Sequence, residues 1–333
     1  MKHIVFAVLL PAFLAGCGGS NPFEADTDTE GDAGSATSVT DLPGTASPGI
    51  DTTILRYESD DEYTIKTISY DSGSDTLLVS GLPFDGADAY VLDAGLSPIG
   101  PDAGFPQYNV YVADPAAVDD DYDGGAGTPI TQDDYIAIYG TGSGTDPKTS
   151  FVVVRTGSYL DYGFGGFVIQ RNVTNTVIPT TGQANYSGNY AGIRVFEGIS
   201  GAELVTGDMT MEIDFAELAD DGAVRGSVTG RETYTTGGVK ITDMPSINWV
   251  IAPAQLDGNG EFMGNVFTLD ADDNSTVQTG TYYAVLAGED AEEIAGVIVL
   301  SGTLDVDSAG VDIMPANATS VQETGGFILD RLD

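Results

Sequence analysis

An acidic segment in the N-terminal half of the chain holds the residues best suited to bind a metal ion. Asp119, Asp121 and Asp123 alternate along the sequence and are followed by Gly124. Alternating carboxylates converge on one point and the glycine permits a sharp turn, as in the first half of an oxygen-ligand calcium loop. The spacing therefore predicts a Ca²⁺ site, for which Asp119, Asp121 and Asp123 are the candidate ligands.

The second half of this loop departs from the calcium pattern. Its twelfth position is Ile130, where a calcium loop places a bidentate glutamate. Asp133 and Asp134 lie nearby and would complete the cage. The alternative is a solvated acidic loop, because a chain with 51 acidic residues produces such runs easily. Apart from Ca²⁺, no cofactor is expected.

The rest of the composition excludes several kinds of chemistry. The 333 residues include 51 acidic and 11 basic ones, and the single histidine, His3, and the single cysteine, Cys17, both lie near the N-terminus. These counts exclude a serine–histidine nucleophile, a zinc site of histidine and thiolate ligands and an intramolecular disulfide. The net charge of −40 would repel a phosphate backbone, so no nucleic-acid binding is expected.

A different role is expected for Cys17, because it directly follows an export signal. Met1–His3 is a short positive start, and Ile4–Leu14 is an apolar run shorter than the roughly 20 residues that span a bilayer. Leu14–Cys17 (LAGC) resembles the bacterial lipobox, whose cysteine is acylated with chains such as palmitate. We therefore expect residues 1–16 to be a lipoprotein signal peptide and Cys17 to carry the lipid; the alternative is an ordinary signal peptide. By resemblance to lipoprotein sorting, Gly18 favours the outer membrane.

The chain after Cys17 divides into a tether and two strand-rich bodies. Residues 17–50 are acidic and poor in large apolar side chains, which predicts a disordered tether. Residues 51–178 show period-two segments separated by Gly, Pro and Asp, which indicates short strands. They are expected at residues 63–70, 76–80, 108–112, 135–139 and 151–155.

The second body, residues 179–333, alternates more regularly. Met209, Met211, Ile213 and Phe215 fall on one strand face, with polar residues between them. Eight strands with one apolar face predict a closed, soluble antiparallel barrel filled by side chains. The whole chain is thus predicted to be all-β. The eight segments are residues 186–196, 209–215, 224–230, 247–251, 261–269, 280–286, 296–301 and 325–332.

Three glycine-rich motifs occur in order in this second body: residues 181–192 (TGQANYSGNYAG), 260–264 (GEFMG) and 280–283 (GTYY) followed by 291–297 (AEEIAGV). They resemble the barrel domain of surface lipoproteins of the transferrin-binding protein B type, over about 45 per cent of the chain. Ala284 and Ala295 stand where that family usually has glycine. We expect the glutamates of residues 291–293 to be solvated in a turn between two strands.

The resemblance implies a handle domain, residues 51–178, followed by an eight-stranded barrel domain, residues 179–333. It also implies a lipid-anchored protein on the cell surface whose binding residues lie in variable loops of the handle. None of these loop residues can be carried over to this chain.

Other side chains that attract attention have ordinary structural interpretations. Trp249, in a strand pattern, is expected in the core or at the barrel rim and not as a sugar platform. The aromatic stretch 159–167 is either an exposed binding loop or a buried hairpin. The scarce arginines are expected to pair with local carboxylates: Arg155, Arg171, Arg194, Arg225 and Arg231.

These observations lead to a non-enzymatic function. The protein is predicted to be an outer-membrane lipoprotein, exposed on the cell surface, that binds a macromolecule or a nutrient carrier and works with an outer-membrane transporter. One alternative is a structural envelope lipoprotein facing the periplasm. The other is a hydrolase with two carboxylates in one cleft.

Overall fold

The computed structural model describes residues 65–332 with short gaps. The predicted signal peptide, Cys17 and the tether lie outside the described residues. Within the described range, no helix is long and apolar enough to cross a membrane. The gaps are residues 66, 72, 83–88, 94–96, 114–117, 120–127, 130–132, 144–146, 158–161, 174, 218–223, 253–255 and 257–259.

The C-terminal part of the chain is a closed barrel of eight antiparallel strands, as predicted. Each strand pairs with the next along the chain, and the last strand pairs with the first, which leaves no open edge in the ring. A ninth strand, β13 (Lys240–Asp243), pairs with β12 outside the ring. The ring consists of β10 (Gln183–Glu197), β11 (Ala202–Asp214), β12 (Val224–Thr235), β14 (Ile247–Trp249), β15 (Glu261–Leu269), β16 (Thr276–Ala287), β17 (Glu293–Gly302) and β18 (Ser320–Leu332).

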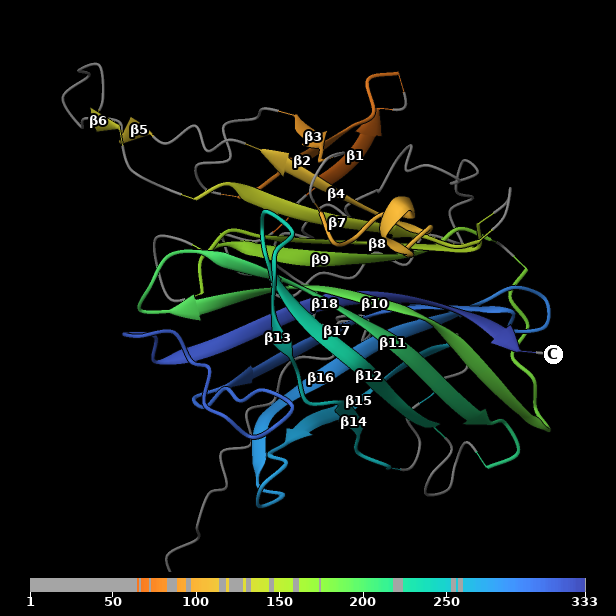
Figure 1. Cartoon of the computed structure of the whole chain (residues 1–333). Coiled ribbons are helices and arrows are strands. Elements are labelled where there is room, and N and C mark those ends of the chain that lie inside the picture. The colour runs from red at the N-terminus through yellow and green to blue at the C-terminus, as the bar shows by residue number, and fades with distance from the viewer. Residues whose placement is uncertain are drawn as a thin grey trace, which may run out of the picture.

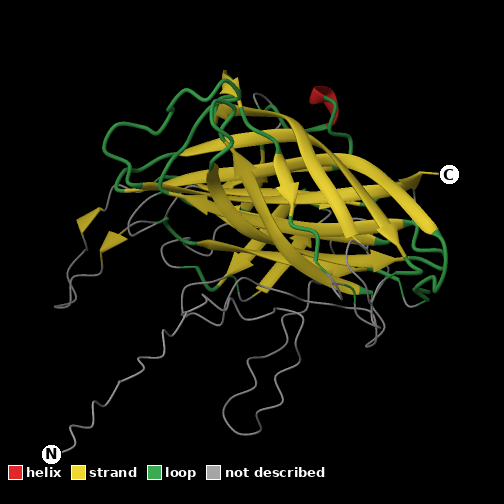
Figure 2. Ribbon diagram, turned by 90° about the horizontal axis from the view of Figure 1, so that it is seen from below, coloured by secondary structure: helices red, strands yellow, loops and turns green. Residues whose placement is uncertain are grey.

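The N-terminal part is a seven-stranded antiparallel sheet, called sheet A below. Figure 1 shows sheet A as a layer above the barrel, and Figure 2 shows the barrel strands side by side with most loops gathered at their two ends. The described residues include one short 3-10 helix, Pro101–Ala103, and a separate two-stranded pair, β5 (Val118–Asp119) with β6 (Thr128–Pro129). Sheet A has the order β1 (Thr67–Asp71), β2 (Thr76–Ser80), β3 (Tyr90–Leu92), β4 (Tyr108–Ala113), β7 (Tyr135–Thr141), β8 (Thr149–Arg155) and β9 (Gly165–Arg171).

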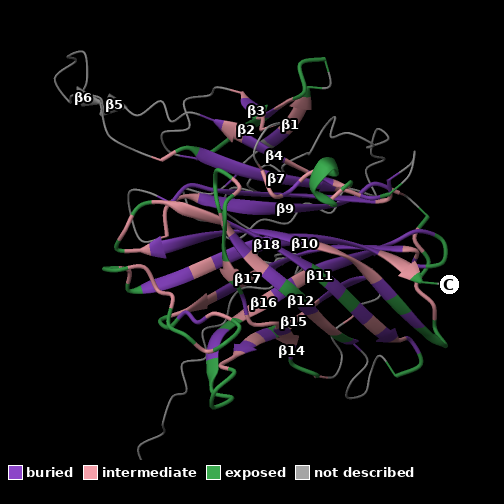
Figure 3. Cartoon of the chain, in the orientation of Figure 1, coloured by how far each residue is buried: buried purple, intermediate pink, exposed green. Residues whose placement is uncertain are grey.

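The burial of each strand follows its sequence pattern. In β11, Met209, Met211 and Ile213 point into the barrel core as the alternation predicted. In β8, a continuous apolar run is buried on both faces, because the barrel covers one face of sheet A and its own curled strands cover the other (Figure 3). Val153 thus packs toward the barrel and Val152 toward β1–β3.

A hydrophobic layer joins sheet A to the barrel. Phe151 and Phe167 of sheet A pack with Ile193, Val297 and Ile328 of the barrel in one buried cluster. None of these five side chains is more than 1% exposed. The two bodies therefore share a core instead of meeting through a thin, wet contact.

Tyr108 extends this contact into the barrel's hydrogen-bond ladder. Its hydroxyl donates to the carbonyl oxygen of Asn189 at 2.5 Å and accepts from the amide of Ile328 at 2.9 Å. Asn189 and Ile328 are direct partners across β10 and β18, the seam that joins the first and last strands. A side chain of sheet A thus bridges the two strands whose pairing closes the barrel.

The eight barrel segments predicted from alternation all overlap strands, although the segments 209–215 and 247–251 extend one and two residues past the ends of β11 and β14. The described parts of the five handle segments also overlap strands. Two strands of sheet A were missed. The sequence around β9 is rich in glycine and aromatic residues and therefore resembles that of a loop. Strand β3 is too short to show the alternation of apolar and polar residues. Of the aromatic stretch, Phe167 is buried in β9, which fits the buried-hairpin interpretation at that position.

Candidate functional site

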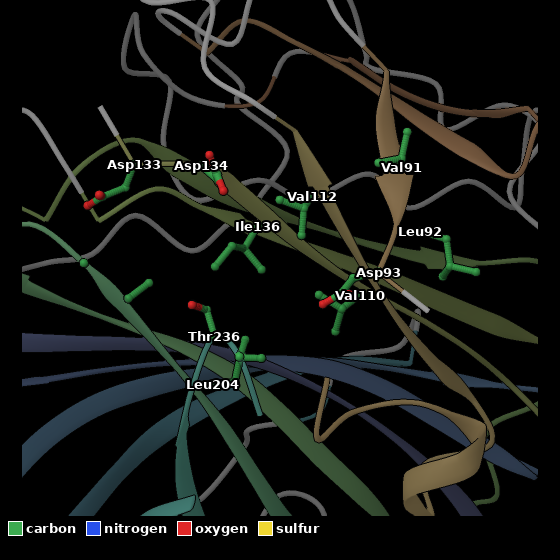
Figure 4. A pocket seen from close by; sticks show the side chains of 13 residues that line it. Val91, Leu92, Asp93, Val110, Val112, Asp133, Asp134, Ile136, Leu204 and Thr236 are labelled. Carbon is green, nitrogen blue, oxygen red and sulfur yellow. The ribbon is translucent and has the colours of Figure 1, made fainter. Parts of the chain in front are cut away.

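An open cleft lies where sheet A meets one rim of the barrel. Strands β3, β4 and β7 form one side, and the start of β11 with the β12–β13 hairpin forms the other (Figure 4). Its volume is about 570 Å³, within the range of pockets that hold ligands. Both bodies therefore contribute to a single hollow.

The floor of the cleft is apolar because of strand alternation. Val110 and Ile136 are residues of β4 and β7 whose side chains face the barrel, and Leu204 of β11 faces them from the barrel side. All three are buried, whereas Val91 on β3 is 57% exposed at the mouth. The apolar lining of the cleft thus runs from buried side chains of the shared core to exposed side chains at its mouth.

Three carboxylates surround this floor: Asp93, Asp133 and Asp134. Asp93 directly follows β3 and is held by a hydrogen bond from its amide to the carbonyl of Val110. Asp133 and Asp134 directly precede β7, where the Thr156 hydroxyl donates to the Asp133 carbonyl. No lysine or arginine occurs among the described residues that line the cleft.

A close approach of two backbones fixes the cleft near Gly201. The amide of Gly201, in the β10–β11 turn, donates to the carbonyl of Gly157 at 3.0 Å. A Cβ atom added to Gly157 would lie 1.9 Å from the Gly201 carbonyl oxygen, so only glycine fits there. The relative position of the rim and sheet A is therefore set by backbone contact.

The calcium prediction remains a prediction. Asp119 forms part of β5, paired with Thr128, while Asp121 and Asp123 lie outside the described residues. In the part of the chain that the structure describes, no group of three acidic residues could hold a metal ion. Asp133 and Asp134, expected to complete the cage, line the cleft.

A second set of charges is sealed inside the barrel. Arg194 pairs with Glu203 at 2.6 Å and with Asp305, and Arg231 pairs with Glu323 at 2.5 Å. Burial lowers the pKa of Arg194, but the neighbouring carboxylates, Asp305 foremost, outweigh it and the pKa is raised. The guanidinium of Arg194 therefore stays charged, whereas burial raises the pKa of Asp305.

Two other arginines contact neutral groups of the barrel, so their expected pairing with carboxylates stays a prediction. Arg155 of β8 donates to the Thr324 hydroxyl of β18 at 2.8 Å, and Arg171 of β9 donates to the Leu286 carbonyl of β16 at 2.7 Å. Both contacts cross from sheet A to the barrel. Trp249 is buried in the barrel core, tilted against a tyrosine ring, as expected of a structural residue.

The expectation that the glutamates of residues 291–293 are solvated is wrong for Glu293. This residue begins β17, and its side chain faces sheet A, where it is 4% exposed. The Thr149 hydroxyl donates to its carboxylate at 2.5 Å. Burial, with a smaller contribution from Asp330, raises the pKa of Glu293 to about 7. Sequence reasoning missed this because the strand starts earlier than its glycine pattern suggests.

Glu293 also lines a second, more polar pocket of about 660 Å³ at the other side of the barrel. Asp330 is its cross-strand partner and accepts a hydrogen bond from the Ser143 hydroxyl. Lys148 and Arg331 line the same pocket. Mixed charge distinguishes this pocket from the cleft, whose described lining residues include acidic side chains but no lysine or arginine.

Comparison with known proteins finds a family that is similar to most of the barrel. Residues 176–298 match a family model described as "Factor H binding protein, C-terminal". The barrel is similar to that domain. The match covers six of the eight ring strands and the first part of a seventh, β17, and none of the seven strands of sheet A. No curated protein matches the chain at a significant level.

Several solved structures found by comparison carry the name of the family that the sequence motifs resemble. Two are mutants of transferrin binding protein B from Haemophilus parasuis Hp5: one is 16% identical with a TM-score of 0.34, the other 13% identical with a TM-score of 0.37. They cover 59% and 78% of this chain, which spans only 35% and 40% of their lengths. A mutant from Actinobacillus pleuropneumoniae H49 is 12% identical with a TM-score of 0.34, over 80% of this chain and 97% of that one. The handle-plus-barrel architecture that the resemblance implied is the one observed here.

Proposed function

We propose that the protein is a surface-displayed outer-membrane lipoprotein, anchored through Cys17, that binds a macromolecule or a nutrient carrier protein. The observation that carries this proposal is the open cleft, which sheet A and the barrel build together with an apolar floor and a charged rim. The lipobox-like sequence LAGC and the acidic segment after it support an anchor and a spacer. Binding, and not catalysis, is the activity that such a surface favours.

The names of the similar proteins agree with this class of function. Factor H binding protein and transferrin binding protein B are, by their names, proteins that bind other proteins. We carry over that coarse class only. The ligand of this protein, delivery to an outer-membrane transporter and the sites of contact are part of the proposal.

The first test locates the protein. Protease added to intact cells should remove it, while a periplasmic control protein survives. The Cys17→Ala substitution removes the proposed lipid attachment site. In Triton X-114 phase partition, the variant should therefore move from the detergent phase to the aqueous phase. Resistance to protease, under conditions that digest a known surface protein, would favour the periplasmic structural alternative.

The second test looks for the ligand. The full-length Cys17→Ala protein, immobilised in its folded form, should retain a protein from host or environmental fluids. Recovery of envelope components alone would contradict the binding function and favour a structural role.

A further inference from the structure

We propose that a hollow on the outer wall of the barrel binds an uncharged carbohydrate. The hollow lies over β15 and β16 and reaches Val250 after β14 and Ser301 of β17, with a volume of about 640 Å³. Figure 1 shows β14 and β15 on the side of the barrel away from sheet A. The hollow shares no lining residue with the cleft that carries the proposed function. This inference therefore goes beyond that function, and each can fail without the other.

Strand alternation and register place an asparagine, a phenylalanine and two threonines together on the outer face of the barrel. Val266 belongs to the barrel core, so its neighbours Asn265 and Phe267 face outward. Asn265 pairs with Thr281 of β16. Phe267 pairs with Thr279 of the same strand. Residues that pair directly share a face of the sheet, so these four side chains form two adjacent rows.

A glycine leaves part of the hollow without a side chain. Gly280 separates the two threonines of β16 and lines the hollow. A Cβ atom added to it would lie 2.0 Å from the carbonyl oxygen of Val299 in β17, so the two backbones approach too closely for a larger residue. The packing of β16 against β17 therefore keeps this part of the hollow open.

The polar side chains of the hollow are available to a ligand. Asn265 and Thr279 are exposed, and Thr281 is half-buried. None of these three side chains has a hydrogen-bond partner among the described residues. An amide offers two donors and an acceptor, and a hydroxyl both donates and accepts. Sugar hydroxyl groups have the same dual character, so they can pair with these side chains in either direction.

The hollow also offers apolar surface. Phe267 is half-buried, and Val250 is 39% exposed. One face of a sugar ring presents mainly C–H groups, which gain from leaving water and are attracted by the negative face of an aromatic ring. A hydroxyl-rich ligand with one apolar face therefore matches both parts of the lining.

The composition of the lining disfavours other classes of ligand. None of the described lining residues is charged, although the chain carries a net charge of −40, so an ionic ligand would find no opposite charge there. Protein interfaces draw most of their binding energy from tryptophan, tyrosine and arginine, whereas serine and threonine are under-represented among such residues. Threonine, serine and asparagine supply all the polar side chains of this hollow. A neutral ligand rich in hydroxyl groups fits it best.

The experiment screens the full-length Cys17→Ala protein against an array of neutral oligosaccharides that end in glucose, galactose, mannose or N-acetylhexosamine, each printed beside its sialylated form. At least one neutral oligosaccharide should bind. Its sialylated form should bind at least threefold more weakly, because the hollow has no cation for the added carboxylate and the acidic protein repels it. Calorimetric titration with the strongest neutral binder should give the same affinity, within twofold, at 0.05 M and 0.5 M salt, since no charges pair.

Two pairs of variants place the binding. Asn265→Ala should weaken it at least fivefold, whereas Asn185→Ala, at an exposed position of β10, should change it less than twofold. Thr279→Trp should block the hollow and abolish detectable binding, whereas Thr210→Trp, at an exposed position of β11, should not. Circular dichroism and thermal unfolding establish the fold of each variant.

Three results would overturn the inference: no neutral oligosaccharide bound at millimolar concentration, a sialylated form bound as tightly as the neutral one, or equal losses in the hollow variants and their matched controls. A protein partner captured in the second test above, with no carbohydrate bound, would also refute it, while the proposed function would stand. Carbohydrate binding at the hollow without any captured protein would instead count against the proposed function alone.

Discussion

Replacing Glu293 with glutamine should stabilise the protein in neutral solution. The carboxyl group is 4% exposed between β17 and sheet A, where burial raises its pKa from 4.5 to about 7. The groups that face it are the Thr149 hydroxyl, which donates to it, the Asp330 carboxylate, which repels its charge, and Lys148, which attracts it. Glutamine keeps the shape and an acceptor oxygen for Thr149, and it carries no charge to bury.

The sign of the effect follows from proton linkage. Below pH 4.5 the glutamate is protonated in both the folded and the unfolded protein, so it adds no pH dependence. Between pH 4.5 and about 7 the unfolded chain releases the proton while the folded protein keeps it, and the free energy of unfolding falls as pH rises. A shift of this size corresponds to about 3 kcal/mol, reached above pH 7.

The assay is urea unfolding of wild type and Glu293→Gln between pH 4 and pH 8 at constant ionic strength, followed by tryptophan fluorescence. The two proteins should differ little at pH 4, and the variant should be more stable by up to about 3 kcal/mol at pH 8. Glu217→Gln, which removes one charge from an exposed position, controls for general repulsion in a chain of net charge −40. A difference that stays constant across this pH range, or a variant less stable at pH 8, would refute the reasoning.

Three further substitutions test the packing between and within the two bodies. Tyr108→Phe leaves the Asn189 carbonyl and its partner amide at the barrel seam without the bridging hydroxyl, and urea unfolding should show a loss of about 1–3 kcal/mol, with faster amide exchange at the seam. Glu323→Gln weakens the central carboxylate of the sealed ionic cluster and should cost about 3–5 kcal/mol in the same assay; an effect below 1 kcal/mol would contradict a buried charge network. Gly326→Ala would place a Cβ atom 2.0 Å from the Phe151 ring, so thermal unfolding should occur at lower temperature, and adding Phe151→Leu should restore part of the loss.

Much of the barrel follows from local pattern, because alternation requires no knowledge of distant residues. In the part of the strand that contains Met209, every second residue is apolar. This alternation matches an antiparallel barrel, in which one face of each strand is buried and the other face can contact solvent. The same rule located the longer strands of sheet A. It failed for β9, where glycine and aromatic residues conceal the period, and for β3, which is only three residues long.

The cleft lay beyond this kind of reasoning. Asp93, Asp133 and Thr236 are far apart in the sequence and come together because sheet A packs against the barrel rim. Glu293 reads locally as part of a solvated turn, yet its strand register turns it toward sheet A. The sequence around the cleft residues and around Glu293 does not indicate which distant segment will cover them.

The amino-acid sequence by itself determined the strand class, the barrel, the absence of histidine chemistry in the folded body and the candidate anchor at Cys17, because each depends on composition or on neighbours along the chain. The tertiary structure decided which face of each strand is covered and therefore which charges are sealed, which titrate and which line an open cleft. Arg194 and Asp93 illustrate the division: both are charged residues in or beside strands, but one lies inside a closed ring and the other at the junction of two bodies. Burial by distant segments sets the energy of a charge, and only the packed chain specifies that burial.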